Sequence, residues 1–176
     1  MSTRCSSRTA SGFVVAVGLA AGLSLAGCGT NLPATAPATG TVLYRGKPVE
    51  GVVVLFGRGN RDLAKGELAI GTTDAQGRFE LITNIGPQAD VKGAVPGQYE
   101  VTLSKAVPPP GISESQYRAL VEAATKIGET GAMVPPEKQP PPTVEMFPPR
   151  YSVAGKSELK ADVTERGPND FQFKLE

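Results

Sequence analysis

Alternation of apolar and polar residues marks short β-strands along most of the chain from residue 41 onwards. In residues 98–103, for example, Tyr99, Val101 and Leu103 fall on one face and the polar residues on the other, which is the period of a half-buried strand. Turns containing Gly and Pro separate such runs, as in residues 46–48. The pattern predicts seven strands, at residues 41–45, 52–56, 68–73, 78–82, 98–103, 159–163 and 171–175. Seven short alternating strands predict an all-β fold, a seven-stranded antiparallel Greek-key β-sandwich.

A proline-rich insertion, residues 106–150, interrupts the strands. Its proline runs cannot be central strands because proline lacks the backbone N–H that a sheet ladder needs. Between these runs, Ser113 and Gln116 form a capping box and Gly128 is a C-terminal stop, so we expect a helix over residues 114–127. Its apolar residues recur at helical spacing and form one stripe: Tyr117, Leu120, Val121, Ala124 and Ile127.

The N-terminus has the layout of a secretory signal peptide. Arg4 and Arg8 precede an uncharged, mostly apolar run over residues 12–27, which is shorter than the ~20 residues of a membrane-spanning helix. The run ends in Leu25-Ala26-Gly27-Cys28, which resembles the bacterial lipobox. The resemblance implies cleavage after residue 27 and acylation of Cys28, whose thiol is the nucleophile that a lipid donor needs. Two or three acyl chains anchor a protein stably where one does not.

The chain organisation and location follow from this interpretation. Residues 1–27 are a signal peptide, residues 28–39 a lipidated N-terminus and flexible tether rich in Pro, Ala and Thr, and residues 40–176 one domain. Gly29 follows the cysteine, and in a lipoprotein this favours the outer membrane, facing the periplasm or the surface, over retention in the inner membrane.

Composition removes several function classes. The mature part has sixteen Lys and Arg and seventeen Asp and Glu, without the basic footprint that nucleic-acid binding requires. The chain has no histidine, which excludes Ser-His-Asp and Cys-His catalysis and histidine-ligated zinc. Asp74 and Gly77 suit a tight turn better than a calcium loop, because the oxygen ligands that calcium needs do not follow. We therefore expect no enzyme activity, no cofactor and no metal.

Four phrases together resemble the carboxypeptidase regulatory-like domain, which has a transthyretin-like (prealbumin-like) fold. They are GTVLYRGKPVEGVVVLF, GTTDAQGRFEL, GAVPGQYEVTLSK and NDFQFKL, in the family's order, and the pattern to which they belong extends over most of residues 40–176, interrupted by the proline-rich insertion. The resemblance implies a stable, non-catalytic module found beside enzymes or on cell surfaces. It does not extend to the hydroxyisourate hydrolases of similar fold, whose chemistry depends on histidines and a C-terminal motif that this chain lacks.

Two function classes remain open. The first is a lipid-anchored structural or protein-interaction module of the cell envelope. The second is an envelope lipoprotein that binds carbohydrate or another nutrient polymer through exposed aromatic residues. The core pattern requires most aromatic residues, so Tyr117, Phe147 and Tyr151 are the candidates for partner or ligand contacts.

The insertion and one basic loop also leave alternatives. The helix packs over an open face of the sandwich, or else it binds a partner or the membrane. The proline runs are stiff solvated spacers, or they dock into an aromatic groove of another protein. Arg58, Arg61 and Lys65 lie in a loop that we expect to be solvated, since Asp62 and Glu67 interrupt the positive charge.

Overall fold

The computed structural model describes residues 33–62, 65–85 and 90–176. Every described residue belongs to one compact unit of the chain, the second of two, Leu32–Glu176. The predicted signal peptide, the lipobox and Cys28 lie outside the described residues.

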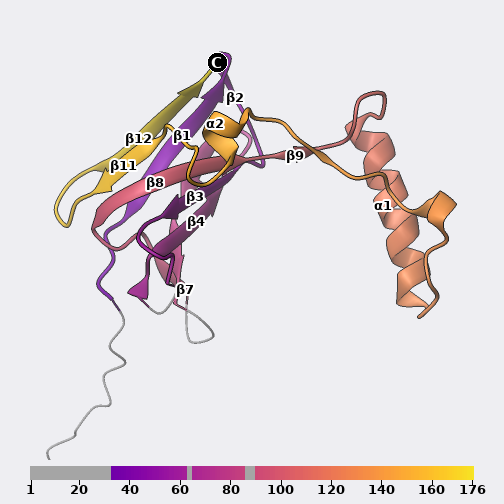
Figure 1. The fold of residues 1–176 in the computed structure, drawn as a ribbon, viewed down its shortest axis with the longest axis horizontal. Coiled ribbons are helices and arrows are strands. Elements are labelled where there is room, and N and C mark those ends of the chain that lie inside the picture. The colour runs from indigo at the N-terminus through magenta and orange to yellow at the C-terminus, as the bar shows by residue number, and fades with distance from the viewer. Residues whose placement is uncertain (1–32, 63–64, 86–89) are drawn as a thin grey trace, which may run out of the picture. The chain divides into compact units, whose positions relative to one another are not determined.

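The second unit consists mostly of β-strands (Figure 1). The strands are β1 Ala38–Tyr44, β2 Lys47–Pro48, β3 Val53–Gly57, β4 Leu68–Thr72, β5 Arg78–Glu80, β6 Ile82–Asn84, β7 Asp90–Lys92, β8 Gly97–Ser104, β9 Ala106–Val107, β10 Val144–Glu145, β11 Lys160–Val163 and β12 Asn169–Leu175. The helices are α1 Glu114–Glu129, the 3-10 helix η3 Pro136–Lys138 and α2 Pro149–Ser152. The all-β prediction is confirmed, because α1 is the only described helix longer than four residues.

The strands form two large sheets and one small ladder. The four-stranded sheet has the order β12-β1-β2, and β5 also pairs with β1. The six-stranded sheet has the order β11-β8-β3-β4-β6-β7, and β9 pairs with β10. Each of the seven predicted runs coincides with strand, but the described residues hold twelve strands in all. The additional strands β2, β7, β9 and β10 have two or three residues each, too few to show a period in the sequence.

The twelfth strand arises where the chain crosses from one sheet to the other. The run predicted at residues 78–82 is two strands, since β5 pairs with β1 in the four-stranded sheet and β6 pairs with β4 in the six-stranded sheet. Leu81 lies between them and is fully buried. Its N–H donates to the carbonyl of Ala38 (2.9 Å) and its carbonyl accepts from the N–H of Gly93 (2.7 Å). Both backbone groups are therefore satisfied at the crossing.

The ends of the domain pair in parallel. β1 and β12 run side by side from the pair Ala38–Asn169 to the pair Tyr44–Leu175, whereas every other strand pair in the described residues is antiparallel. The prediction of an antiparallel fold is correct for those pairs and wrong for this one. A parallel pair needs a long connection between its strands, and here the whole domain supplies it.

One core lies between the two sheets, with Phe56 near its centre. The ring of Phe56 lies 5.3 to 6.4 Å, centroid to centroid, from the rings of four other aromatic residues: Phe79, Tyr99, Phe171 and Phe173. These four come from β5, β8 and β12, so the contacts join both sheets. The core positions predicted for these residues are confirmed, although Phe171 is only partly buried.

The domain begins earlier than residue 40. Ala36 and Ala94 exchange backbone hydrogen bonds of 2.8 and 3.0 Å, and Ala36 and Ala38 are buried. Residues 36–39, which the sequence predicts to be tether, are therefore part of the folded domain. Small side chains in a Pro- and Thr-rich stretch are typical of a linker. Here the small side chains of Ala36 and Ala38 are buried, where the chain lies close to the backbone of neighbouring segments.

We predict that Gly40→Ala strongly destabilises the domain. A Cβ at residue 40 would meet the carbonyl oxygen of Phe171 and the Cζ of Phe79, the latter at 2.6 Å. Overpacking of this kind costs about 1–3 kcal/mol. Urea unfolding checks the prediction, and Gly128→Ala is the control because a Cβ there meets no atom within 4 Å. Equal unfolding midpoints for the two variants would contradict the packing at Gly40.

Candidate interaction site

Helix α1 is formed and capped by its own sequence. The Ser113 side chain accepts a hydrogen bond from the N–H of Gln116 (3.3 Å), and the Gln116 side chain accepts one from the N–H of Ser113 (2.9 Å), which confirms the capping box. The C-terminal end lies later than predicted. The helix continues to Glu129, with Thr130 as C-cap, and Gly131 rather than Gly128 has the positive φ, 76°, that follows many helix ends.

The apolar stripe of α1 is not buried by its own domain. No residue of α1 is buried, and Leu120 and Val121 are exposed. The expectation that the helix packs its stripe over a face of the sandwich is therefore wrong in this structure. On the opposite side of the helix, Glu122 and Lys126 form an ion pair of 2.8 Å that faces solvent.

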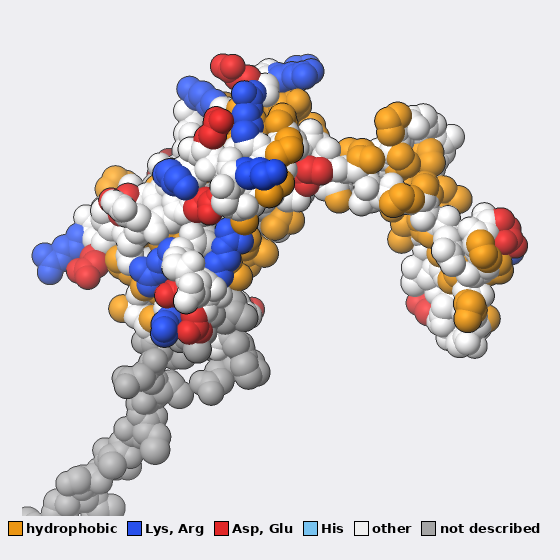
Figure 2. Space-filling view, viewed as in Figure 1, with side chains coloured by type: hydrophobic (Ala, Val, Ile, Leu, Met, Phe, Trp, Pro, Cys, Tyr) orange, Lys and Arg blue, Asp and Glu red, His pale blue; other side chains and the backbone are white. Residues whose placement is uncertain are grey.

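The proline-rich segment after α1 partly shields the stripe. η3 contacts α1, and Val134, Pro135, Pro140 and Pro141 are half-buried, as are Tyr117, Ala124 and Ile127 of the helix. We call residues 106–145, from β9 to β10, the arm. Figure 2 shows that much of the arm's surface on the viewed face is apolar or uncharged.

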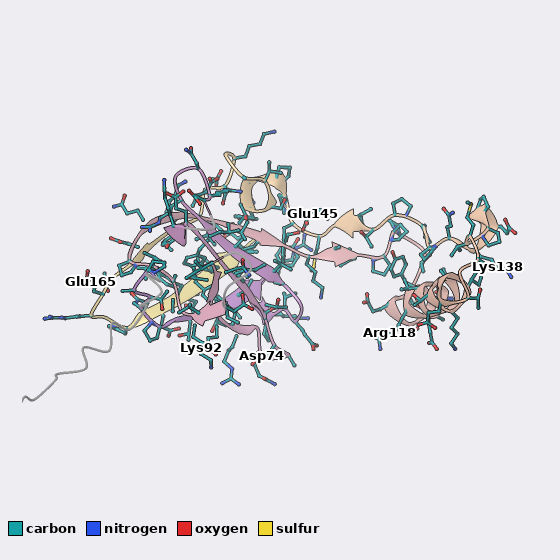
Figure 3. All side chains as sticks on the ribbon, turned by 90° about the horizontal axis from the view of Figure 1, so that it is seen from below. Asp74, Lys92, Arg118, Lys138, Glu145 and Glu165 are labelled. Atoms are coloured by element: carbon teal, nitrogen blue, oxygen red, sulfur yellow. The ribbon has the colours of Figure 1, made fainter. Side chains whose placement is uncertain are left out.

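The base of the arm is held to β8 by one carboxylate. Glu145 accepts hydrogen bonds from the Ser104 hydroxyl (2.6 Å), the Lys105 N–H (3.0 Å) and the Phe147 N–H (3.0 Å). Next to it, Val107 pairs with Val144 and Ala106 with Glu145 in the β9–β10 ladder. Figure 3 labels Glu145 at this base and Arg118 on α1. No residue of 108–143 is buried, so the arm beyond its base adds no side chain to the core of the domain.

Phe147 and Tyr151, two of the three aromatic candidates for ligand contacts, belong to the core instead. Phe147 is 3 % exposed and packs edge-on against the Tyr44 ring, with centroids 5.5 Å apart. Tyr151, in α2, is 8 % exposed. Tyr117 is half-buried on α1, so the three residues form no exposed aromatic platform. Phe147 and Tyr151 lie outside the strands, so no alternation of apolar and polar residues indicated that they would be buried.

The outer face of the six-stranded sheet carries an apolar row that the sequence analysis did not single out. Leu55 of β3 is opposite Ile70 of β4, which in turn is opposite Ile82 of β6. Val53 lies two residues before Leu55 on the same face. Val53, Ile70 and Ile82 are each 37 to 42 % exposed, and Leu55 is half-buried. The unbroken apolar run of residues 52–56 is the signal that both faces of β3 are apolar.

An open hollow of about 740 Å³ lies over β8 and β11, and its charges are of both signs. Gly57 leaves room for it, and the side chain of Arg61 lies over that glycine. Glu100 forms an ion pair with Arg61 (3.6 Å) and accepts a hydrogen bond from the N–H of Gly155 (2.6 Å). Lys160 and Asp162 also line the hollow. Arg61 and Glu100 are paired with each other, and the lining as a whole carries charges of both signs, so the hollow presents no field of a single sign.

The basic loop is tied to the domain more than predicted. Arg58 donates to the carbonyl of Pro96 (2.9 Å), and its guanidinium lies 5.4 Å from the centre of the Tyr99 ring. Burial raises the pKa of Tyr99, and Arg58 lowers it to a smaller extent. Lys65 is exposed, as expected, beside Asp62 at 3.6 Å. Arg58 and Arg61 are therefore packing residues of this loop.

The Asp74 turn is confirmed. The Asp74 carboxylate accepts hydrogen bonds from the N–H groups of Gln76 and Arg78, both at 2.9 Å, and Gly77 has a φ of 72°. Within residues 33–62, 65–85 and 90–176, no group of three Asp, Glu, His or Cys side chains lies together as a metal site. No helix in the same ranges is long and apolar enough to span a bilayer.

In comparisons with known proteins, the chain matches no family model, no curated protein and no solved structure. The arm and the apolar row are therefore candidate interaction surfaces on the basis of their geometry alone.

We predict that Asp74→Asn lowers stability at neutral pH but not in acid. The hydrogen bond from the Arg78 N–H is the main cause that lowers the pKa of Asp74, and the Gln76 N–H and the Arg78 guanidinium add to it. A carboxyl whose pKa is lower in the folded state stabilises the fold above its unfolded pKa, and this contribution is lost as the pH falls through the folded pKa. Urea unfolding at pH 7 and in acid measures the difference. A difference between the two proteins that persists unchanged in acid would contradict a role for the charge.

Proposed function

We propose that the protein is a lipid-anchored, non-catalytic interaction module of the cell envelope and that the arm is its interacting element. The lipobox resemblance at Leu25, Ala26, Gly27 and Cys28 supports the anchor. The order of the four sequence phrases supports a Greek-key sandwich of the transthyretin-like, carboxypeptidase regulatory-like type. The location that these features favour is the outer membrane, facing the periplasm or the surface.

One observation carries the assignment to interaction. α1 is a sixteen-residue amphipathic helix with caps at both ends, yet none of its residues is buried. An isolated helix of this length is marginal in water, and most helices gain their stability by burying an apolar face. The sequence of α1 encodes both its caps and its apolar stripe, although the helix does not pack in the core of its own domain. Such a helix is suited to packing its apolar face against another protein.

The charge of α1 favours a protein partner over a lipid surface. The helix carries Glu114, Glu122 and Glu129 against Arg118 and Lys126, which gives a net charge of minus one. Helices that lie on anionic membranes have polar faces rich in Lys and Arg. The carbohydrate alternative has less support, because Phe147 and Tyr151 are packed in the core.

The anchor is tested by the intact mass of the native protein extracted from membranes. We expect the mass of residues 28–176 plus acyl chains, and we expect Cys28→Ser to lack the acyl mass. A mature wild-type chain without acyl mass, recovered in the soluble fraction, would contradict the anchor. That result would leave the role of the arm to be judged separately.

The interaction role is tested by replacing residues 108–143 with Asn-Gly, a two-residue hairpin turn that joins Val107 to Val144. Because none of the deleted residues is buried, we expect the thermal midpoint to shift by less than the roughly 2–4 °C that 1 kcal/mol produces in a domain of this size. We also expect the variant to lose the adducts that chemical crosslinking produces in intact envelopes.

The matched control for this experiment is Glu122→Gln, which changes the solvent-facing side of α1 and leaves the stripe unchanged. It should retain the crosslinked adducts. Adducts that persist after removal of the arm, in a folded variant, would contradict the proposed function.

A further inference from the structure

Strand β12 forms a long open edge of the four-stranded sheet. It pairs with β1 on one side, and no described strand pairs with it on the other. The remaining edge strands of the two large sheets, β2, β5, β7 and β11, have two to four residues each, whereas β12 has seven. Proteins commonly keep edge strands short, because a long open edge is a template for another strand. β12 is therefore the edge where a further strand fits best.

The backbone of β12 directs hydrogen-bonding groups to this open side. The carbonyl of Leu175 accepts a hydrogen bond of 2.8 Å from the N–H of Arg45, at the end of the parallel ladder with β1. Successive residues of a strand direct their N–H and C=O groups to opposite sides, so those of Asp170, Gln172 and Lys174 point away from β1. An extended strand satisfies such a row of groups, because it pairs by main-chain hydrogen bonds.

The exposed side chains of β12 are arranged symmetrically about its middle. Asp170, Gln172 and Lys174 are exposed, and Gln172 is the central residue of Asn169–Leu175. The acid and the base thus lie two residues to either side of the centre. Asp170 accepts a long hydrogen bond from the Thr39 hydroxyl (3.4 Å), and neither charged residue belongs to an ion pair of the described structure. Both charges remain available to a neighbouring strand.

This arrangement is complementary to itself. When a second copy of β12 pairs in the antiparallel direction about a two-fold axis at Gln172, Asp170 of each copy lies opposite Lys174 of the other. All seven residues of both strands then overlap, and the two opposite-charge pairs stabilise the ladder. A two-fold axis produces each contact twice, as is typical of homodimers. The order of the charges therefore favours a second copy over an unrelated strand.

The two neighbouring registers are less favourable. An axis at Phe171 would place Lys174 opposite Pro168, which has no N–H for the ladder. An axis at Phe173 would place Asp170 opposite Glu176, and like charges directly opposite one another destabilise a sheet. A shift by one residue would turn the apolar side chains of one copy to the wrong face. The sequence of β12 thus favours one register.

The inner face supports the same register. Phe171 is only half-buried at the edge of the core, and its ring stacks on the Phe173 ring of its own strand, with centroids 6.3 Å apart. In the register centred on Gln172, Phe171 of each copy lies opposite Phe173 of the other. Cross-strand aromatic pairs stabilise a sheet, and the half-buried ring would lose further exposure to water.

We propose that the protein forms a symmetric dimer in which β12 of two copies pair in the antiparallel direction about Gln172 and join their four-stranded sheets. The inference goes beyond the proposed function, and it does not involve the arm. Two seven-residue strands are smaller than the roughly 20–30 residues a side of a standard stable interface. We therefore expect the dimer mainly where copies are concentrated, as anchoring on one bilayer would provide.

The test uses the absence of cysteine after Cys28. A full-length Gln172→Cys chain is oxidised in its native membrane. Opposite hydrogen-bonded residues of an antiparallel ladder have Cα atoms about 5.5 Å apart, which suits a disulfide. We expect a disulfide-linked dimer at least about tenfold more abundant than with Glu80→Cys, the ratio that 1.4 kcal/mol of preference gives.

Glu80 is the matched control, since it is exposed and lies on β5, two strands away from β12 across β1. Thermal unfolding of each variant verifies that it is folded. The chain without an introduced cysteine measures any background from Cys28.

Exchange of the two charges tests the register. Added to Gln172→Cys, Lys174→Asp would place two carboxylates opposite each other at both pairs, and we expect the dimer yield to fall about tenfold. Further addition of Asp170→Lys restores opposite charges across the axis and should restore the yield. An effect of Lys174 confined to its own copy would not be rescued in this way.

Three results would overturn the proposal. The first is a dimer yield from Gln172→Cys no greater than that from Glu80→Cys. The second is a yield that does not fall with Lys174→Asp or is not restored by the charge exchange. The third is a disulfide from Gln172→Cys to a different protein instead of a second copy.

The dimer and the arm are tested separately. Removal of residues 108–143 should leave the β12 dimer intact, because the arm contributes no residue to it. The adducts that test the arm are those with other proteins, and their loss is the result expected for the arm alone. A β12 dimer that disappears with the arm, in a folded variant, would contradict the pairing at β12.

Discussion

The parallel pairing of β1 with β12 is the constraint on which the rest of the domain depends. It joins the first and last strands over seven residue pairs and so closes the whole domain into one loop. Gly40 lies in the middle of β1, where the absence of a side chain lets Phe79 and the Phe171 backbone approach. The contacts of Phe56 with aromatic residues of both sheets then fix the sheets against each other. No residue of 108–143, the arm beyond its base, is buried in this core.

The sequence predicts the seven alternating runs well because the strands that they form bury at least one face. An apolar residue at every second position identifies β8 and β12 without ambiguity. Polar residues alternate with Tyr99, Val101 and Leu103 in β8, and with Phe173 and Leu175 in β12. It does not predict which strands pair or in which direction, because parallel and antiparallel strands alternate alike. The crossing at Leu81 does not change this pattern either: buried and exposed positions keep alternating from Phe79 to Thr83 while the hydrogen-bond partners change sheet.

The candidate site was less predictable, because its features depend on what each element meets. The capping box and the stripe of α1 are local patterns, and both are present in the structure. Whether the stripe is buried depends on tertiary contacts that no local pattern contains. Phe147 and Tyr151 look like spare aromatic residues among prolines, yet a short turn of helix brings them into the core. The apolar row arises from strand register, which aligns Leu55, Ile70 and Ile82 from three separate runs.

We propose a closed scaffold and an arm whose apolar face takes part in association, and hydrogen exchange of the α1 amides tests this separation most directly. The full-length chain would be compared in its native membrane and after dilution into detergent, where copies and partners separate. The account predicts that the β3 and β8 amides are equally protected in both states and that the α1 amides lose protection on dilution, because a short helix without a packing partner opens readily. Equal protection of α1 in both states would contradict it.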